Sequence, residues 1–351
     1  MSTSLELARA SYRDIAVYSV ESTPCDVDVS DNTNLWGAPP AATRALRDLA
    51  DGAFTRYPSA YANELKHAIA GYAGVDASRI VTGCGSDDIL DSAIRAFAEP
   101  GDRLALCAPT FAMIPIFARL NGVETVAIPL TASWNIDADG LAGADARIIY
   151  VCSPNNPTGT AASRGALEHL IANTSGVIIL DEAYAEFADD DHLDLAAGSD
   201  RVLVVRTMSK AFGLAGLRVG YALGATALVG EVEKSRGPYK VSIAAERAAV
   251  AALREDRTWV TERAAFARIA RARLAESLHA LGLSPLPSQA NFVLVPVPRA
   301  VSVARRLREL GVAVRAFERL PAVGDALRIT AGPAPMMERL AVALEEALAC
   351  A

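Results

Sequence analysis

A single lysine, Lys210, lies in the apolar and glycine-rich segment TMSKAFGLAGLRVG, residues 207–220. A lysine held among apolar groups loses the hydration of its charged form, so its pKa falls and its amine becomes a nucleophile. The same residue could instead be a surface lysine at the end of a strand, with its charged end extended into water. This segment alone leaves both interpretations open.

A second segment, GCGSDDIL at residues 83–90, joins an expected strand to an expected helix. Its glycines let the backbone approach a ligand, and the start of the helix offers free N–H groups and the positive end of a dipole to a phosphate. Ser86 and Asp87 could also act only as caps of this helix. The segment by itself is therefore a weak indication of a phosphate site.

Two further segments place polar groups at the ends of expected strands. SPNNPTG, residues 153–159, is a rigid turn at the carboxyl end of a strand, where open α/β sheets bind ligands. VIILDEAYAEF, residues 177–187, is a buried strand that runs directly into Asp181, with Tyr184 three positions later. A buried carboxylate requires a partner, so Asp181 indicates a bound cationic group.

Together the four segments describe a phosphate-bearing cofactor with an acid beneath it and a lysine bonded to it. Pyridoxal 5'-phosphate meets this description, because its aldehyde condenses with an amine and its ring nitrogen acts as an electron sink when protonated. A carboxylate next to that nitrogen holds the proton by charge attraction. The sequence therefore predicts a pyridoxal 5'-phosphate site.

The combination SPNNPTG, LDEAYAEF, RTMSKAFGLAGLRVGY and ALRIT resembles the fold-type I aminotransferases, and among them the histidinol-phosphate aminotransferase family. The resemblance covers the chain from about Asp31 to its last helix. It implies a homodimeric enzyme that moves an amino group from an amino donor, with histidinol phosphate as the first candidate, to a 2-oxo acid such as 2-oxoglutarate. The motifs are specific for fold and cofactor, and less so for the substrate.

By this resemblance, Lys210 would carry the cofactor and move the proton between substrate and cofactor. Asp181 would pair with the ring nitrogen, and Tyr184 and Asn156 would hydrogen-bond the ring hydroxyl. Phe111 would stack on the ring, where the family usually has a tyrosine. The remaining cofactor-binding residues, most of them around the phosphate, would be Gly85, Ser86, Asp87, Ser209 and Arg218.

The resemblance also implies residues for the substrate and the partner subunit. Tyr57 would reach across a dimer interface to the cofactor phosphate of the other subunit. Arg328 would bind the anionic end of the substrate, with Arg315 nearby, although either could be a surface charge at a strand end. Tyr18 and Asn34 would complete the substrate side.

Two departures from the family pattern bear on the substrate. The segment NTNLWG, residues 32–37, stands where the family commonly has Asn-Glu-Asn-Pro-Tyr-Gly, and this segment usually closes over the site. Lys240 stands where the family commonly has an asparagine. We expect Lys240 either to adjust which amino donor is accepted or to face water.

Alternatives to histidinol phosphate remain open. One is an aromatic or other amino acid of secondary metabolism as the donor, and another is a lyase similar to the phosphothreonine decarboxylases, which share these motifs. A regulator that carries an aminotransferase-like domain would need a DNA-binding module ahead of it, and only about 30 residues precede the expected cofactor domain.

The order of elements predicts an α/β fold with a mostly parallel sheet covered on both faces, because short apolar strands alternate with helices. The resemblance implies that this sheet has seven strands. The expected strands span residues 79–83, 103–109, 123–128, 146–151, 176–180 and 201–207. A smaller α/β domain is expected to follow, with strands over 291–297, 312–317 and 326–332 and helices over 301–311 and 334–349. We expect an N-terminal arm over 1–38, a large cofactor-binding domain over 39–245 and a small domain over 246–351.

Composition excludes several classes of function. The 351 residues are 52% hydrophobic and 21% charged, with a formal charge of −7 and no basic stripe, so no nucleic-acid partner is expected. The sequence contains no run of about 18 apolar residues, so no membrane span is expected. The five cysteines lack the pair spacing of metal sites and indicate a reducing, cytoplasmic environment without a bound metal.

Overall fold

The computed structural model describes residues 7–13, 15–17 and 24–349. Their main sheet has seven strands in the order β2-β8-β7-β6-β5-β3-β4. The strands are β2 (Ile80–Cys84), β3 (Arg103–Ala108), β4 (Glu124–Pro129), β5 (Ile148–Cys152), β6 (Val177–Asp181), β7 (Val202–Thr207) and β8 (Val219–Leu223). Only β8 runs antiparallel to its neighbours in this sheet, which confirms the predicted mostly parallel, seven-stranded sheet.

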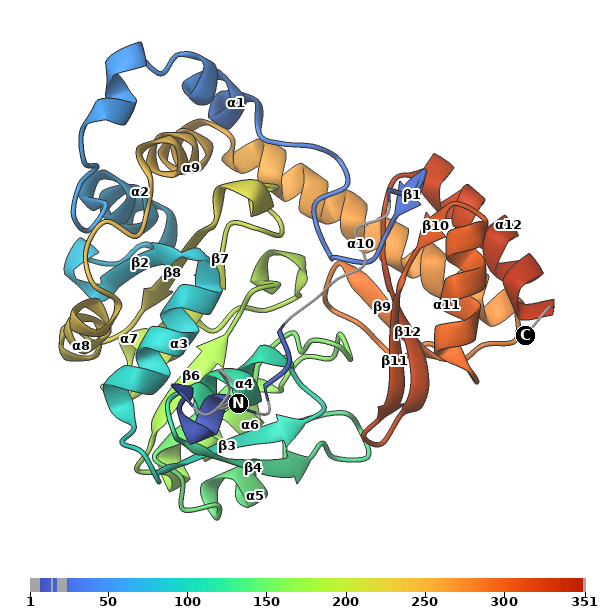
Figure 1. Cartoon of the computed structure of the whole chain (residues 1–351), viewed down its shortest axis with the longest axis horizontal. Helices are drawn as coiled ribbons and strands as arrows, with labels where there is room; N and C mark the ends of the chain where they lie inside the picture. Colours follow the sequence, from blue (N-terminus) through green and yellow to red (C-terminus); the bar gives the residue numbers. More distant parts are fainter. Residues whose placement is uncertain (1–6, 14, 18–23, 350–351) are drawn as a thin grey trace.

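Helices cover both faces of this sheet, as Figure 1 shows. Alternate strand residues point to opposite faces, so Leu104 and Leu106 pack with one group of helices and Ala105 and Cys107 with the other. The first group is α3 (Gly85–Phe97), α4 (Met113–Leu120) and α8 (Thr226–Arg236). The second is α5 (Ala138–Ala142), α6 (Arg164–Asn173) and α7 (Leu193–Ala197). Helices α1 (Pro40–Arg47), α2 (Asn63–Ala73) and α9 (Ile243–Glu255) contribute to a further core at the β2 end.

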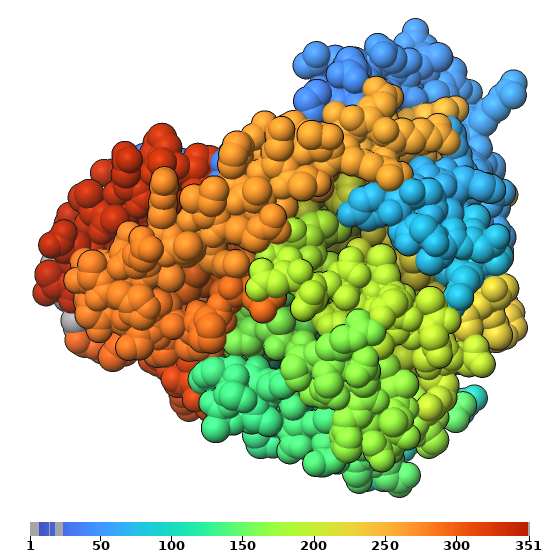
Figure 2. Space-filling model, turned by 180° about the vertical axis from the view of Figure 1, so that it is seen from behind, coloured from blue at the N-terminus to red at the C-terminus, as the bar shows by residue number. Residues whose placement is uncertain are grey.

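The stretch from residue 243 to residue 280 forms two helices. Helix α9 ends at Glu255 and α10 (Arg257–Ala280) begins two residues later. Asp256 lies between them, and its carboxylate accepts the backbone N–H of Ala41 at 2.7 Å, at the start of α1. Helix α10 then runs along the surface to the smaller part of the molecule, which Figure 2 shows from behind.

The smaller part contains a three-stranded antiparallel sheet in the order β11-β12-β9. Its strands are β9 (Phe292–Pro296), β11 (Arg315–Leu320) and β12 (Gly324–Thr330), and its core also includes α11 (Ala300–Glu309) and α12 (Ala334–Ala349). The prediction of a single strand over residues 312–317 is wrong. It is divided into β11 and a separate β10 (Val312–Ala313), because β10 pairs in parallel with β1 (Val27–Asp28) of the N-terminal segment.

Two negative findings apply to the described chain. None of its helices combines the length and the apolar character needed to cross a bilayer. None of its His, Cys, Asp and Glu clusters could hold a metal ion.

Candidate active site

A cavity of about 190 Å³ lies at the carboxyl ends of the parallel strands, where the arm and β12 also approach. Open α/β sheets bind ligands at this edge. The cavity brings together ten residues that the sequence predicted as a site: Ser86, Asp87, Phe111, Asn156, Asp181, Tyr184, Ser209, Lys210, Arg218 and Arg328. It also includes Asp31, Asn32, Cys152, Ala183 and Thr207, which were not predicted individually as site residues.

Asp181 ends β6 and is buried, with 3% of its surface exposed. Burial raises the pKa of its carboxyl to about 6, although the hydroxyl of Tyr150 and the N–H of Ala183 act in the opposite direction. Tyr150 donates to Oδ2 at 2.7 Å, and the Ala183 N–H donates to Oδ1 at 3.1 Å. A carboxylate with this pKa is mostly ionised at neutral pH and can attract a cationic group in the cavity.

Tyr150 was missed by sequence reasoning, although the strand pattern contained a signal. Strands β5 and β6 are parallel neighbours, with Cys152 opposite Asp181 and Tyr150 opposite Ile179. Tyr150 therefore shares a face of the sheet with Asp181. It lies on the neighbouring strand, two register positions before Asp181, where a long side chain can reach the carboxylate. A polar aromatic residue in an otherwise apolar buried strand needs a partner for its hydroxyl, and Asp181 supplies it.

Lys210 follows β7, and its Nζ donates to the backbone carbonyl of Asp31 at 3.0 Å. The amine also lies 5.8 Å from the centre of the Tyr184 ring. Burial, together with the positive charge of Arg328, lowers the pKa of Lys210 to about 8, against the opposing effect of Asp31 and Asp87. At neutral pH a useful fraction of the amine is therefore unprotonated and nucleophilic.

The start of α3 forms an anion-binding end of the cavity. Gly85 has a φ of +80°, and a Cβ there would lie 2.6 Å from Nη2 of Arg218. A Cβ on Gly220 would lie 2.3 Å from the backbone nitrogen of Ser86. Glycine at both positions thus allows β8, Arg218 and the first turn of α3 to approach closely. The result is a group of backbone N–H donors next to a guanidinium, which is the donor set that a phosphate requires.

Arg218 connects this end to its neighbours. Its Nη1 donates to Oγ of Ser209 at 3.3 Å, and its Nη2 lies 3.4 Å from Oδ2 of Asp87. Burial raises the pKa of Asp87, and Arg218 and Lys210 act against that shift. The donor groups at this end and the ionised Asp181 fit a phosphate and a protonated ring nitrogen, respectively, of one elongated cofactor.

The opposite side of the cavity is built by the N-terminal arm and β12. Nδ2 of Asn32 donates to the hydroxyl of Tyr184 at 3.1 Å, and burial raises the pKa of that hydroxyl to about 12. Arg328 donates to Oδ1 of Asn156 at 2.7 Å and to the carbonyl of Ser30 at 2.7 Å. Asn32 thus joins the N-terminal arm to Tyr184.

The other predicted substrate residues do not line the cavity in the described chain. Arg315 is the register partner of Arg328 across β11 and β12, so the two arginines lie side by side on the small sheet. Asn34 donates from Nδ2 to the carbonyl of Ala211 at 2.8 Å, which ties the arm to the residue after Lys210. Tyr18 lies outside the described residues.

Tyr57 and Lys240 also lie apart from this cavity. Tyr57 is 84% exposed and its ring stacks against Tyr239 with the centroids 4.9 Å apart. Lys240 donates from Nζ to Oδ1 of Asp88 at 2.9 Å and is not among the described residues that line the cavity. The hypothesis that Lys240 meets the substrate therefore lacks support from the geometry.

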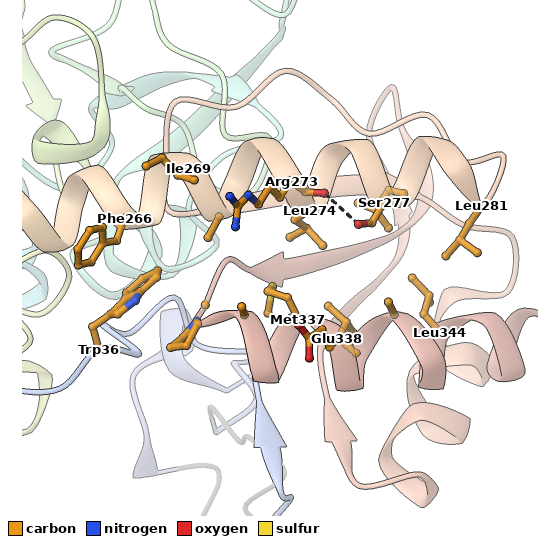
Figure 3. Close-up of a pocket in the computed structure, with 17 residues that line it drawn as sticks. Trp36, Phe266, Ile269, Arg273, Leu274, Ser277, Leu281, Met337, Glu338 and Leu344 are labelled. Atoms are coloured by element: carbon orange, nitrogen blue, oxygen red, sulfur yellow. Dashed lines mark hydrogen bonds between the residues drawn. The ribbon is translucent and has the colours of Figure 1, made fainter.

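A second hollow, shown in Figure 3, lies between α10 and α12 and has a volume of about 390 Å³. Apolar side chains such as Trp36, Leu274 and Met337 dominate its wall, and the charged Arg273 and Glu338 also border it. Its described lining holds no lysine, cysteine or histidine that could act as a nucleophile or base. The polar cavity at the sheet edge is therefore the candidate active site.

Comparisons with known proteins agree with this geometry. Residues 25–344 match the family described as aminotransferase class I and II. A histidinol-phosphate aminotransferase of Roseiflexus castenholzii is 38% identical over 331 residues, with 90% of this chain and 88% of that protein covered. The crystal structure of histidinol-phosphate aminotransferase from Sinorhizobium meliloti in complex with pyridoxal-5'-phosphate superposes with a TM-score of 0.86 at 26% identity, covering 93% of this chain and 92% of that one.

The fold itself is shared more widely. L-threonine-O-3-phosphate decarboxylase from Porphyromonas gingivalis superposes with a TM-score of 0.81 at 22% identity, covering 92% of this chain and 99% of that one. At that identity the likeness concerns the fold alone.

The charge of Arg328 next to Lys210 generates a testable pH dependence. In Arg328→Gln the lysine loses a neighbouring positive charge, so its pKa should rise above the present value of about 8. Burial remains, so the pKa should stay below the ordinary 10.5. The measurement is the pH dependence of trinitrobenzenesulfonate labelling at Lys210 in the cofactor-free protein, followed by mass spectrometry.

Arg315→Gln is the matched control, because Arg315 lies beside Arg328 on the small sheet. Its labelling midpoint should remain at that of the wild type. An unchanged midpoint in Arg328→Gln would contradict the electrostatic coupling of Arg328 to Lys210.

Proposed function

We propose a function for this chain, which belongs to the class I and II aminotransferases. The enzyme moves the amino group of histidinol phosphate to a 2-oxo acid such as 2-oxoglutarate. Its cofactor is pyridoxal 5'-phosphate, which supplies, when bound, an electron sink for the bonds broken at the substrate Cα. One observation carries the proposal. A single cavity contains an anion-binding helix start, a buried carboxylate and an amine whose pKa is lowered to about 8.

Asp181 holds a proton on the ring nitrogen. The carboxyl has a pKa of about 6, so it is largely ionised at neutral pH and stabilises a positive charge next to it. Tyr150 and the Ala183 N–H each occupy one carboxylate oxygen, so Asp181 is fixed in position while it keeps acceptor capacity for the ring N–H. Phe111, which also lines the cavity, offers an aromatic face for the ring.

Lys210 has two roles in this proposal. Its unprotonated amine would hold the cofactor by condensing with the aldehyde, with loss of water. Once exchanged for the substrate amine, the same Lys210 amine would act as the base that accepts the proton of the substrate Cα, because its pKa is close to the working pH. Tyr184 and Asn156 line the wall beside it and supply hydrogen bonds to the ring hydroxyl.

Arg328 meets the anionic end of each substrate. Its planar fork suits a carboxylate or a phosphate held by two parallel bonds. In the structure the guanidinium is already oriented by its bonds to Asn156 and to the carbonyl of Ser30. Histidinol phosphate and a 2-oxo acid both carry an anionic group, so the same arginine can serve both halves of the reaction.

The donor is tested by single half-reactions of the cofactor-loaded enzyme. Histidinol phosphate, an aromatic amino acid and phosphothreonine are mixed separately with the enzyme in a stopped-flow spectrophotometer. We expect histidinol phosphate to have the highest kcat/KM and to leave the cofactor in its aminated form. Lys210→Ala is the control and should lose the conversion by several orders of magnitude, because both the covalent exchange and the proton transfer need its amine.

Two outcomes would contradict this assignment. Preference for the aromatic donor would indicate an aminotransferase of another substrate class. Release of carbon dioxide from phosphothreonine, with no aminated cofactor, would indicate a lyase.

We also propose a homodimer, which the exposure of Tyr57 supports. The ring is 84% exposed on its own chain, and Phe54 nearby is 65% exposed, so aromatic surface that one chain leaves open is available for a second copy. We propose that Tyr57 reaches the cofactor phosphate of the partner subunit.

Mixing two defective variants tests the shared site. In an equal mixture of Lys210→Ala and Tyr57→Phe chains, about half of the dimers are mixed and one of the two sites in each carries neither lesion, so about a quarter of all sites should regain full activity. The activity of the mixture is compared with the mean of the two parents, with subunit exchange followed by mass spectrometry. Exchange without a gain over that mean would exclude a site shared through Tyr57.

A further inference from the structure

Lys240 forms an ion pair with the first turn of α3. Its Nζ donates to Oδ1 of Asp88 at 2.9 Å, while Oδ2 of Asp88 accepts the backbone N–H of Cys84 at 3.0 Å. The Asp88 side chain is only 13% exposed and that of Lys240 is 38% exposed. One carboxylate thus joins the segment after α8 to the turn between β2 and α3.

The position of Asp88 makes its charge relevant to the anion-binding end of the cavity. Asp87 and Asp88 both lie in the first turn of α3. Negative side chains there occupy the positive end of the helix and repel a phosphate bound at the same place. Each carboxylate is matched by one cation, Asp87 by Arg218 at 3.4 Å and Asp88 by Lys240.

The turn itself leaves Asp88 little freedom. A Cβ on Gly83 would lie 2.7 Å from Cγ1 of Ile89 and 3.0 Å from Oδ2 of Asp88, so glycine is required there for the strand to pass this close to the helix. The bond from the Cys84 N–H then fixes the carboxylate against the turn. Because Asp88 cannot move away from the helix start without losing that bond, its charge must be balanced where it stands.

The segment that carries Lys240 is also held in place. The N–H of Tyr239 donates to the carbonyl of Ala60 at 2.8 Å, and its ring stacks on Tyr57. A second cation, Arg236, is buried nearby, where it donates to the carbonyl of Gly237 and lies over the Tyr61 ring. Arg236 is 3% exposed and lies 4.0 Å from the carboxylate of Glu233, so it compensates Asp88 only in part.

We propose that Lys240 is a positioning residue for the phosphate end of the site, which balances the charge of Asp88 and keeps Asp88 on the β2–α3 turn. Lys240 thereby acts on the cofactor and not on the choice of amino donor. This inference rests on the proposed function in one respect, that the start of α3 receives the cofactor phosphate.

The test measures release of pyridoxal 5'-phosphate from the loaded enzyme into an excess of a trapping apoenzyme, together with the phosphorus NMR resonance of the bound phosphate. Lys240→Met should release the cofactor about fivefold faster, as loss of about 1 kcal/mol of charge compensation implies. Asp88→Asn should release it no faster than the wild type, because the amide oxygen still accepts the Cys84 N–H and no charge remains to be balanced. The double variant should behave like Asp88→Asn.

Lys234→Met is the matched control, since Lys234 forms an exposed ion pair with Glu231 on α8. It should leave both the release rate and the phosphorus resonance unchanged. The ratio of kcat/KM between donors should also stay constant in Lys240→Met.

Three results would overturn the positioning role. Wild-type release in Lys240→Met would show that Asp88 needs no partner. Fast release in the double variant would show that Lys240 acts through another group. A changed donor ratio with unchanged release would make Lys240 a substrate residue. A wild-type protein that retains no pyridoxal 5'-phosphate would instead contradict the proposed function itself, and the positioning role with it.

Discussion

The buried carboxylate of Asp181 is the constraint on which the rest of the site depends. An ionised group at the end of a central strand is costly unless a cation and hydrogen-bond donors meet it. Tyr150, on the neighbouring strand, and the Ala183 N–H satisfy part of that need. In the proposed function, the protonated ring nitrogen of the bound cofactor meets the remaining need. The parallel order of β5, β6 and β7 is what brings Tyr150, Asp181 and the segment of Lys210 to one edge.

The charged side chains at that edge of the sheet act on two different parts of the site. Arg218 and Lys240 are each directed at an acid in the first turn of α3, so the helix start can receive a phosphate in spite of Asp87 and Asp88. Arg328 donates to oxygens of Asn156 and Ser30, and its positive charge helps to lower the pKa of Lys210. Arg218 and Lys240 therefore act on the start of α3, whereas Arg328 acts on the amine of Lys210.

Much of this arrangement could be predicted from sequence because local patterns carry it. Six strands of the main sheet were readable as apolar runs, and glycine-rich or proline-rich turns marked the ends where ligand groups gather. Features that depend on pairing between distant segments were not readable. The antiparallel β8 begins only at the end of the glycine-rich motif of Lys210, and β10 separates from β11 because it pairs with β1. Lys240 is paired with Asp88, which lies 152 residues earlier in the chain. Tyr150 and Asn32 were missed for the same reason, since their partners come from other elements.

The central claim is that the negative charge of Asp181, and not only its hydrogen bond, drives the reaction. The most direct measurement is the stopped-flow rate of the first half-reaction in Asp181→Asn, loaded with pyridoxal 5'-phosphate and compared with the exposed control Asp190→Asn. The amide can still bond to the ring nitrogen but cannot hold its proton by charge, so the rate should fall by at least about 10²-fold while the control remains at the wild-type rate. A near wild-type rate in Asp181→Asn, with the cofactor fully bound, would contradict the account.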